Sequence, residues 1–210
     1  MELRFLNGEI ASDLSEYNDL QKSDFSGADL RNIDFSDRDL RGCNFKNSDL
    51  REVNFSHARL NDCDFSDSLL DGCIFDNAEM ARVQLYKVSA LNASFMSANL
   101  TKCYANNARF DGANFQDVDF TEACFNGSSM IGCDLAYSYL LHAEFKETDL
   151  TRACLDNVVE LDFQWFGGRY ECDEKKISQS LLRIGVSVKD TGWFVNATNI
   201  KKWNMRKGIA

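Results

Sequence analysis

Large apolar side chains recur at every fifth position between Leu20 and Leu155. Of these 28 positions, 12 are Phe, 12 are Leu and 2 are Met, and only Ala90 and Ala105 depart from the pattern. A second track lies two residues before each large residue, and nearly all of its positions hold Ala, Cys, Ser, Val or Thr. A period of five matches neither the roughly 3.6 residues per turn of a helix nor the roughly 2.0 of a strand. We therefore expect the chain to turn at every repeat and to stack coil on coil, with both tracks pointing inward.

Several runs within this region share one consensus. SDFSGADLRNIDF, ANLTKC and ARFDGANFQDVDF all fit the pattern A(D/N)LXX, which extends over about 135 of the 210 residues. In this respect the chain resembles the pentapeptide repeat proteins. The resemblance implies an all-β solenoid, a right-handed quadrilateral β-helix with four repeats per coil and about seven coils. At about 4.8 Å between stacked backbones, such a rod is about 34 Å long.

The repeat divides the chain into three parts. We expect residues 1–19 to form an N-terminal cap or an irregular first coil, 20–160 the β-helix, and 161–210 a C-terminal capping or dimerisation segment. Asp173 is a suitable start for a short helix that ends near Gly185, which makes the expected cap partly helical. Its apolar residues are Ile177, Leu181, Leu182 and Ile184.

The C-terminal run ISQSLLRIGVSV carries a second resemblance. It is similar to the segment through which the quinolone-resistance (Qnr) pentapeptide proteins dimerise, and this implies a homodimer through Ile177, Leu181, Leu182 and Ile184. The same apolar residues also suit a simple cap, because an open solenoid edge recruits other chains. The roughly 25 basic-rich residues that follow have no counterpart in that group.

The composition fits a solenoid and offers no metal or cofactor site. Proline is absent, which suits a solenoid in which most backbone groups must pair. Five of the eight cysteines stand on the small inward track, where a thiol acts as a compact apolar group; they are Cys43, Cys63, Cys73, Cys103 and Cys133. No CxxC spacing indicates a metal, so we expect free thiols, no metal ligands and no cofactor.

The charge is unevenly distributed. The net charge of −10 combines −14 in residues 1–160 with +4 in 161–210. One of the four faces, led by Phe35 and the large residues at intervals of twenty after it, holds acidic residues but no Lys or Arg. The other three mix acids with bases. We predict that this face binds a partner through Asp34, Asp37, Asp76, Asp117, Asp134 and Asp156.

Two functions remain open for a rod of this kind. The resemblance to the pentapeptide repeat proteins implies the first, a DNA mimic that binds DNA gyrase or topoisomerase IV and protects it from quinolones or toxins. No insertion interrupts residues 20–155, which departs from the projecting loops of many Qnr proteins and is similar to their loop-free mycobacterial relative MfpA. The alternative is a scaffold or regulatory adaptor with an unrelated protein partner. The acidic rod disfavours direct binding to nucleic acid or to anionic membranes.

Catalysis and membrane insertion are both disfavoured by the sequence. Only two histidines occur, His57 and His142, and each is expected at an outward corner, away from any nucleophile motif. We therefore predict that the protein is not an enzyme. No apolar run approaches the roughly 18 residues of a membrane span, and the N-terminal sequence lacks a signal-peptide pattern, which favours a cytoplasmic location.

Overall fold

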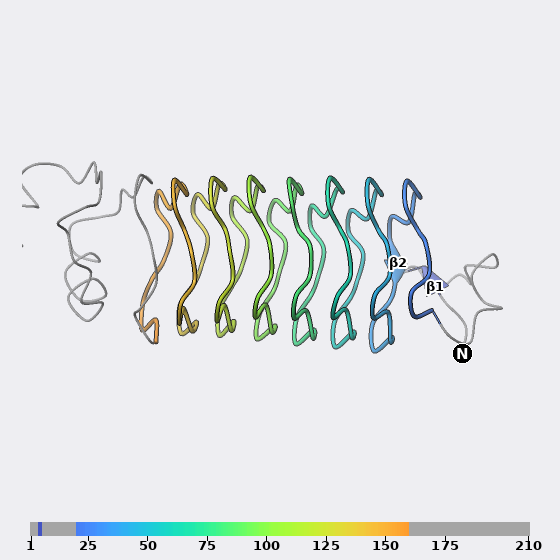
Figure 1. The fold of residues 1–210 in the computed structure, drawn as a ribbon, viewed down its shortest axis with the longest axis horizontal. Coiled ribbons are helices and arrows are strands. Elements are labelled where there is room, and N and C mark those ends of the chain that lie inside the picture. Colours follow the sequence, from blue (N-terminus) through green and yellow to red (C-terminus); the bar gives the residue numbers. More distant parts are fainter. Residues whose placement is uncertain (1–3, 6–19, 160–210) are drawn as a thin grey trace, which may run out of the picture.

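The computed structural model describes Arg4–Phe5 and residues 20–159 of the chain. Its two named strands are β1 (Arg4–Phe5) and β2 (Ile33–Asp34). Elsewhere in 20–159 the β-structure consists of single parallel bridges, each joining residues twenty positions apart, from Asp24↔Asn44 to Tyr139↔Val159. One coil is therefore twenty residues long, and the coils stack in register to form a rod (Figure 1).

A turn follows every large residue and gives each coil four sides. The second residue of each turn has a left-handed backbone, with φ between 55° and 72° in the described repeats. This conformation is costly for most side chains, whereas Gly adopts it freely and Asn tolerates it well. Two successive corners illustrate this, with Gly72 at φ 69° and Asn77 at φ 59°.

Backbone hydrogen bonds join each side of a coil to both neighbouring coils. The amide of Phe75 donates to the carbonyl of Ser94 in the following coil at 2.6 Å. The amide of Ile74 donates to the carbonyl of Val53 in the preceding coil at 3.0 Å. The same exchange recurs at the other large residues, so a proline, which has no amide hydrogen, would break the ladder at most positions.

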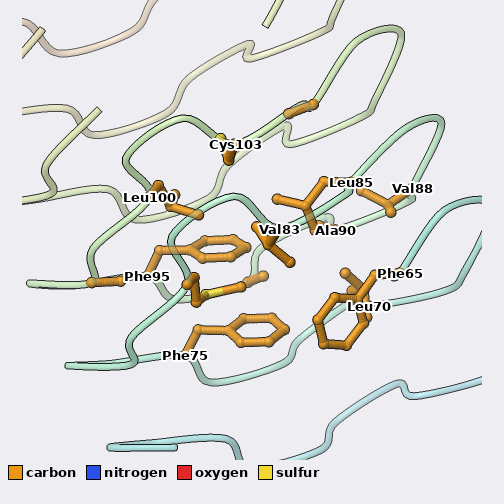
Figure 2. Packing of buried hydrophobic residues seen from close by; sticks show 14 of the residues in the cluster. Phe65, Leu70, Phe75, Val83, Leu85, Val88, Ala90, Phe95, Leu100 and Cys103 are labelled. Atoms are coloured by element: carbon orange, nitrogen blue, oxygen red, sulfur yellow. The ribbon is translucent and has the colours of Figure 1, made fainter. Parts of the chain in front are cut away.

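The interior is built around stacked phenylalanine rings. Two columns of parallel rings run along opposite sides of the rod, with successive centroids 4.8–5.4 Å apart; one contains Phe25, Phe45 and Phe65, the other Phe35, Phe55, Phe75, Phe95 and Phe115. Rings of the two columns meet edge to face. The ring centroids of Phe65 and Phe75, for example, are 6.0 Å apart, and the angle between the ring planes is 86°. Figure 2 shows the parallel rings of Phe75 and Phe95, with Leu70 and Leu85 nearby. These arrangements are the ones that aromatic pairs favour.

The small track packs inside the corners, as predicted. Cys43, Cys63, Cys73, Cys103 and Cys133 are all buried. The thiol of Cys73 donates to the carbonyl of Leu50 at 2.9 Å, and the thiol of Cys133 donates to that of Phe110 at 2.9 Å. Burial raises the pKa of the Cys73 and Cys133 thiols well above the ordinary value, so they remain protonated. These cysteines therefore fill space and satisfy carbonyl groups.

The N-terminal end of the rod is partly closed by β1. This strand pairs antiparallel with β2, in the register Arg4↔Asp34 and Phe5↔Ile33. The other edge of β2 carries the ladder to the next coil through the bridge Asp34↔Asn54. By pairing with β2, β1 occupies backbone groups that an open first coil would leave available to other chains.

The predictions for the C-terminal segment lie outside the described residues. They comprise the partly helical cap and the apolar group of Ile177, Leu181, Leu182 and Ile184. Within 20–159, the ladder continues to its last bridge at Val159. None of the described residues belongs to a helix with the length and hydropathy of a membrane span.

Candidate functional site

The six acidic residues chosen from the sequence lie on one side of the rod. We call this side the acidic face and define it by the outward positions around Phe35, Phe55, Phe75, Phe95, Phe115, Leu135 and Leu155. An unbroken series of bridges runs along its centre, through Asp34, Asn54, Ile74, Ser94, Asn114, Asp134 and Cys154. Asp76 and Asp156 each follow a buried residue, and Asp37 and Asp117 stand at left-handed corners, both with φ 59°.

Two carboxylates of the acidic face, at Asp34 in its first coil and at Asp134 near its other end, accept hydrogen bonds from neutral donors. Asp34 Oδ1 accepts from the Ser36 amide at 3.0 Å and from Asn54 Nδ2 at 3.1 Å. Asp134 accepts from Gln116 Nε2 at 2.5 Å, and its other oxygen accepts from the Ala136 amide at 3.0 Å. Such bonds orient the carboxylates without cancelling their charge.

The central carboxylates are held in the same manner. Asp76 Oδ1 accepts from Ser94 Oγ at 2.5 Å and from the Met96 amide at 3.0 Å, both in the next coil. Asp117 Oδ2 accepts from Ser97 Oγ at 3.1 Å. The face therefore presents fixed negative charges on a rigid backbone, as electrostatic recognition requires.

The neighbouring face shows how different the same backbone can be. We call it the paired face and define it by the outward positions around Leu30, Leu50, Leu70, Ala90, Phe110, Met130 and Leu150. There Arg31 donates to both oxygens of Asp29 at 2.9 and 2.8 Å, and Arg51 donates to both of Asp49 at 2.8 and 2.6 Å. The Arg31 side chain lowers the pKa of Asp29 to about 2. In each of these two pairs the charge of the guanidinium largely cancels that of the carboxylate.

A shallow depression lies at a corner away from the acidic face. Its volume is about 410 Å³, and it is lined by Asp62, Arg82, Gln84, Lys102, Tyr104 and Glu122. Arg82 pairs with Asp62 at 2.7 Å, and Lys102 pairs with Glu122 at 3.5 Å. Because its charges compensate each other and its ionic side chains are about half exposed, this depression is a weaker candidate than the acidic face.

The residues associated with catalysis are scattered. His57 and His142 are exposed at left-handed corners, as the sequence predicted, with φ 59° and 57°. Among the described residues, no group of three or more His, Cys, Asp or Glu side chains is arranged to hold a metal ion. Cys124 is half-buried, and its thiol donates to Asn106 Oδ1 at 2.9 Å, a contact between neighbouring coils.

One feature of the acidic face was missed at the sequence level. Ile74 and Met96 lie near its centre with 40% and 38% of their surface exposed, and Leu69 on the paired face is 40% exposed. Asp, Asn or another polar residue stands before most large residues, whereas Leu69 and Ile74 are apolar at that position. This departure was visible in the sequence as the run LLDGCIFD.

Comparison with known families gives the repeats their classification. A model described as a pentapeptide repeat region matches residues 38–115, and one for pentapeptide repeats in eight copies matches 18–37 and 128–159. The chain belongs to the pentapeptide repeat family. Its members fold as right-handed β-helices, so the predicted fold class is confirmed at that level. No curated protein matches this pentapeptide repeat protein.

Among solved structures of the family, that of HetL supports the fold. HetL of the cyanobacterium Nostoc sp. strain PCC 7120, a protein involved in heterocyst differentiation regulation, is 19% identical with a TM-score of 0.53, covering 76% of this chain and 77% of HetL. QnrB1, a plasmid-mediated fluoroquinolone resistance protein, is 18% identical with a TM-score of 0.42, covering 91% and 92%. A thylakoid-lumen protein of Arabidopsis thaliana is 34% identical over 49% of this chain and 65% of its own, with a TM-score of 0.26.

Proposed function

We propose that this pentapeptide repeat protein is a non-enzymatic binding protein whose acidic face docks into a basic, DNA-binding groove of a protein partner. The observation that carries the proposal is a face with six carboxylates and no Lys or Arg, on which Asp34, Asp76 and Asp134 are held by neutral donors. Type II topoisomerases, DNA gyrase and topoisomerase IV, are the first candidates, because the repeats resemble those of the Qnr group.

The charge on the rod is of the right order for a DNA mimic. We take residues 20–159 as about seven coils, which at about 4.8 Å per coil gives a rod about 34 Å long. One strand of B-DNA of that length carries about ten phosphates. The acidic face carries six carboxylates, so its linear charge density is somewhat more than half that of one strand. This charge density supports attraction by a basic groove. Because it is lower than that of a DNA strand, contacts other than ion pairs can also contribute to binding.

The rigidity of the rod favours binding by a preformed surface. The backbone of the acidic face is fixed by bridges to both neighbouring coils, and Phe35, Phe55, Phe75, Phe95 and Phe115 beneath it are fully buried. A surface that is already ordered loses little conformational entropy on association. Electrostatic attraction then accelerates the encounter with a basic partner.

The test is a titration of the purified protein into a gyrase supercoiling assay, with and without a fluoroquinolone, together with a direct binding measurement. We expect binding, with inhibition or protection. The variant with Asp34→Asn, Asp37→Asn, Asp76→Asn and Asp117→Asn is expected to bind at least tenfold more weakly and to show a shallower dependence of log Kd on log salt. Asn keeps the hydrogen-bond acceptor oxygen and removes the charge.

A matched control removes the same number of charges from a different side of the rod. Asp24→Asn, Asp64→Asn, Asp67→Asn and Glu147→Gln all lie on the side led by Phe25. If both variants weaken binding equally, net charge and not the acidic face is responsible. If the wild type binds neither gyrase nor topoisomerase IV, the topoisomerase assignment is lost, and the scaffold or adaptor function is the one to pursue.

A further inference from the structure

Four apolar side chains stand at outward positions in two adjacent coils, halfway along the rod, and we call them the apolar ridge. It consists of Leu69 and Leu91 on the paired face and Ile74 and Met96 on the acidic face. Leu69, Ile74 and Met96 are 38–40% exposed, and Leu91 is half-buried. Several exposed apolar side chains on adjacent coils are more informative than a single one, because exposed apolar area that gathers in one region indicates an interaction surface.

The ridge is built by one arrangement used twice. In one coil an apolar residue precedes the large residue and Asp follows it, as in Ile74 and Asp76. In the next coil Ser precedes the large residue and an apolar residue follows it, as in Ser94 and Met96, and Asp76 accepts hydrogen bonds from Ser94 Oγ at 2.5 Å and the Met96 amide at 3.0 Å. These two hydrogen bonds draw the Asp76 carboxylate toward the next coil.

The paired face repeats this arrangement at the same level of the rod. Asp71 Oδ1 accepts from Ser89 Oγ at 2.7 Å and from the Leu91 amide at 2.8 Å, both in the next coil. On both faces the outward positions here lack Lys and Arg. The ridge is therefore an apolar surface with acidic surroundings, and the partner that complements it combines apolar with basic side chains.

We infer that the ridge is an anchoring point, which receives an apolar side chain that projects from the basic groove of the partner. This inference rests on the proposed function of the acidic face and adds the chemistry of the partner to it. A DNA duplex presents an unbroken line of phosphates and has no equivalent of Leu69, Ile74 and Met96. The protein therefore selects basic grooves that also contain an apolar contact, which distinguishes its partner from DNA-binding surfaces in general.

The two kinds of contact act on different rate constants. Exposed carboxylates accelerate association and make it salt-dependent. Desolvated apolar contacts at the centre of an interface mainly slow dissociation, and a few such residues commonly dominate the affinity. The two contributions can be measured separately. A variant of the ridge is expected to change the dissociation rate, and a variant of the carboxylates is expected to change the association rate and its salt dependence.

The test compares two variants. The ridge variant carries Leu69→Ser, Ile74→Ser and Met96→Gln together, and the control variant carries only Tyr104→Gln. Each new residue already stands at the equivalent position in a neighbouring coil, at Ser89, Ser94, Gln116 and Gln84, so the backbone ladder is expected to survive. Tyr104 is 49% exposed on a different side of the rod and serves as the control. Thermal unfolding followed by circular dichroism checks that both variants fold.

Binding kinetics to purified DNA gyrase give the first readout. We expect the combined ridge variant to dissociate on the order of tenfold faster or more, with the salt dependence of association unchanged, and the Tyr104→Gln variant to behave as wild type. An unchanged dissociation rate in the ridge variant overturns the inference, and so does an equal effect in the control. In both cases the quadruple carboxylate variant still tests the acidic face separately.

Two synthetic peptides give a readout that does not depend on gyrase. One contains Lys and Leu, and the other has every Leu replaced by Ser, so their charges are equal. The wild type is expected to bind the Leu peptide more tightly than the Ser peptide, and the ridge variant to bind the two alike. Equal affinities with the wild type overturn the inference, even if gyrase binding fails and removes the topoisomerase assignment.

Discussion

The acidic face and the paired face have the same backbone and different electrostatics. Asp29 and Asp34 occupy equivalent positions, each directly before a buried large residue. Two residues after Asp29 stands Arg31, which donates to both of its oxygens, whereas two residues after Asp34 stands Ser36, whose amide is the donor. The inward tracks thus determine the fold, and the outward positions determine the charge independently of it.

This independence explains how one rod can present dissimilar sides. The ion pairs of the paired face are exposed, with 49% of the Arg31 and 60% of the Asp29 side chain accessible. Exposed pairs of this kind contribute little to folding stability. The absence of such ion pairs from the acidic face therefore lowers the folding stability little. Its main effect is on the charge that this face presents to a partner.

The largest expected effect tests whether the two faces share one interior. Phe75 lies beneath the acidic face and Leu70 beneath the paired face, and both are fully buried. We expect Phe75→Ala to lower the free energy of unfolding by about 3–5 kcal/mol and Leu70→Ala by about 2–5 kcal/mol, through lost burial and the cavity left behind. Urea denaturation measures both changes. A loss below about 1 kcal/mol at either position would mean that the coils beneath that face are loosely packed.

Much of the fold was predictable because its cause is a local, repeated constraint. A large residue at every fifth position and a small one two residues before it leave the chain few ways to bury both. The inward cysteines followed from the same register, and Cys43, Cys63, Cys73, Cys103 and Cys133 are buried as predicted. The grouping of the six acids on one side also followed from the period, because residues twenty apart pair in adjacent coils.

Other features depend on contacts that the repeat does not encode. β1 lies before the continuous five-residue register and pairs antiparallel with β2, whereas the register predicts only parallel neighbours twenty residues apart, so the period does not predict this pairing. The neutral partners of Asp76, Ser94 Oγ and the Met96 amide, lie in the following coil, and the Asp76 side-chain rotamer determines whether the carboxylate reaches them. The apolar ridge was overlooked because Leu69 and Ile74 stand at outward positions where the consensus draws attention to Asp and Asn.

A smaller effect is expected from giving the acidic face an arginine. Ser36→Arg places a guanidinium two residues after Asp34, as Arg31 stands after Asp29. We expect the folding free energy to change by no more than about 0.5 kcal/mol, because the new pair is exposed. Affinity for a basic partner is expected to fall several-fold, and association to become less salt-dependent. Ser26→Arg, on the side led by Phe25, is the matched control, and equal losses in both variants would contradict a special role for the acidic face.

The smallest expected effect comes from the reverse change, Arg31→Ser on the paired face. The Arg31 side chain holds the pKa of Asp29 at about 2, below the ordinary value of 3.8. A carboxylate whose pKa is lowered by folding stabilises the protein above its unfolded pKa, and this stabilisation is lost as the pH falls through the folded value. We therefore expect an NMR titration of the Asp29 side chain to move from a midpoint of about 2 toward 3.8 in the variant. The melting temperature near neutral pH is expected to change little, because both side chains are exposed. A midpoint that stays near 2 without Arg31 would show that the backbone amide of residue 31, and not the guanidinium, lowers the pKa of Asp29.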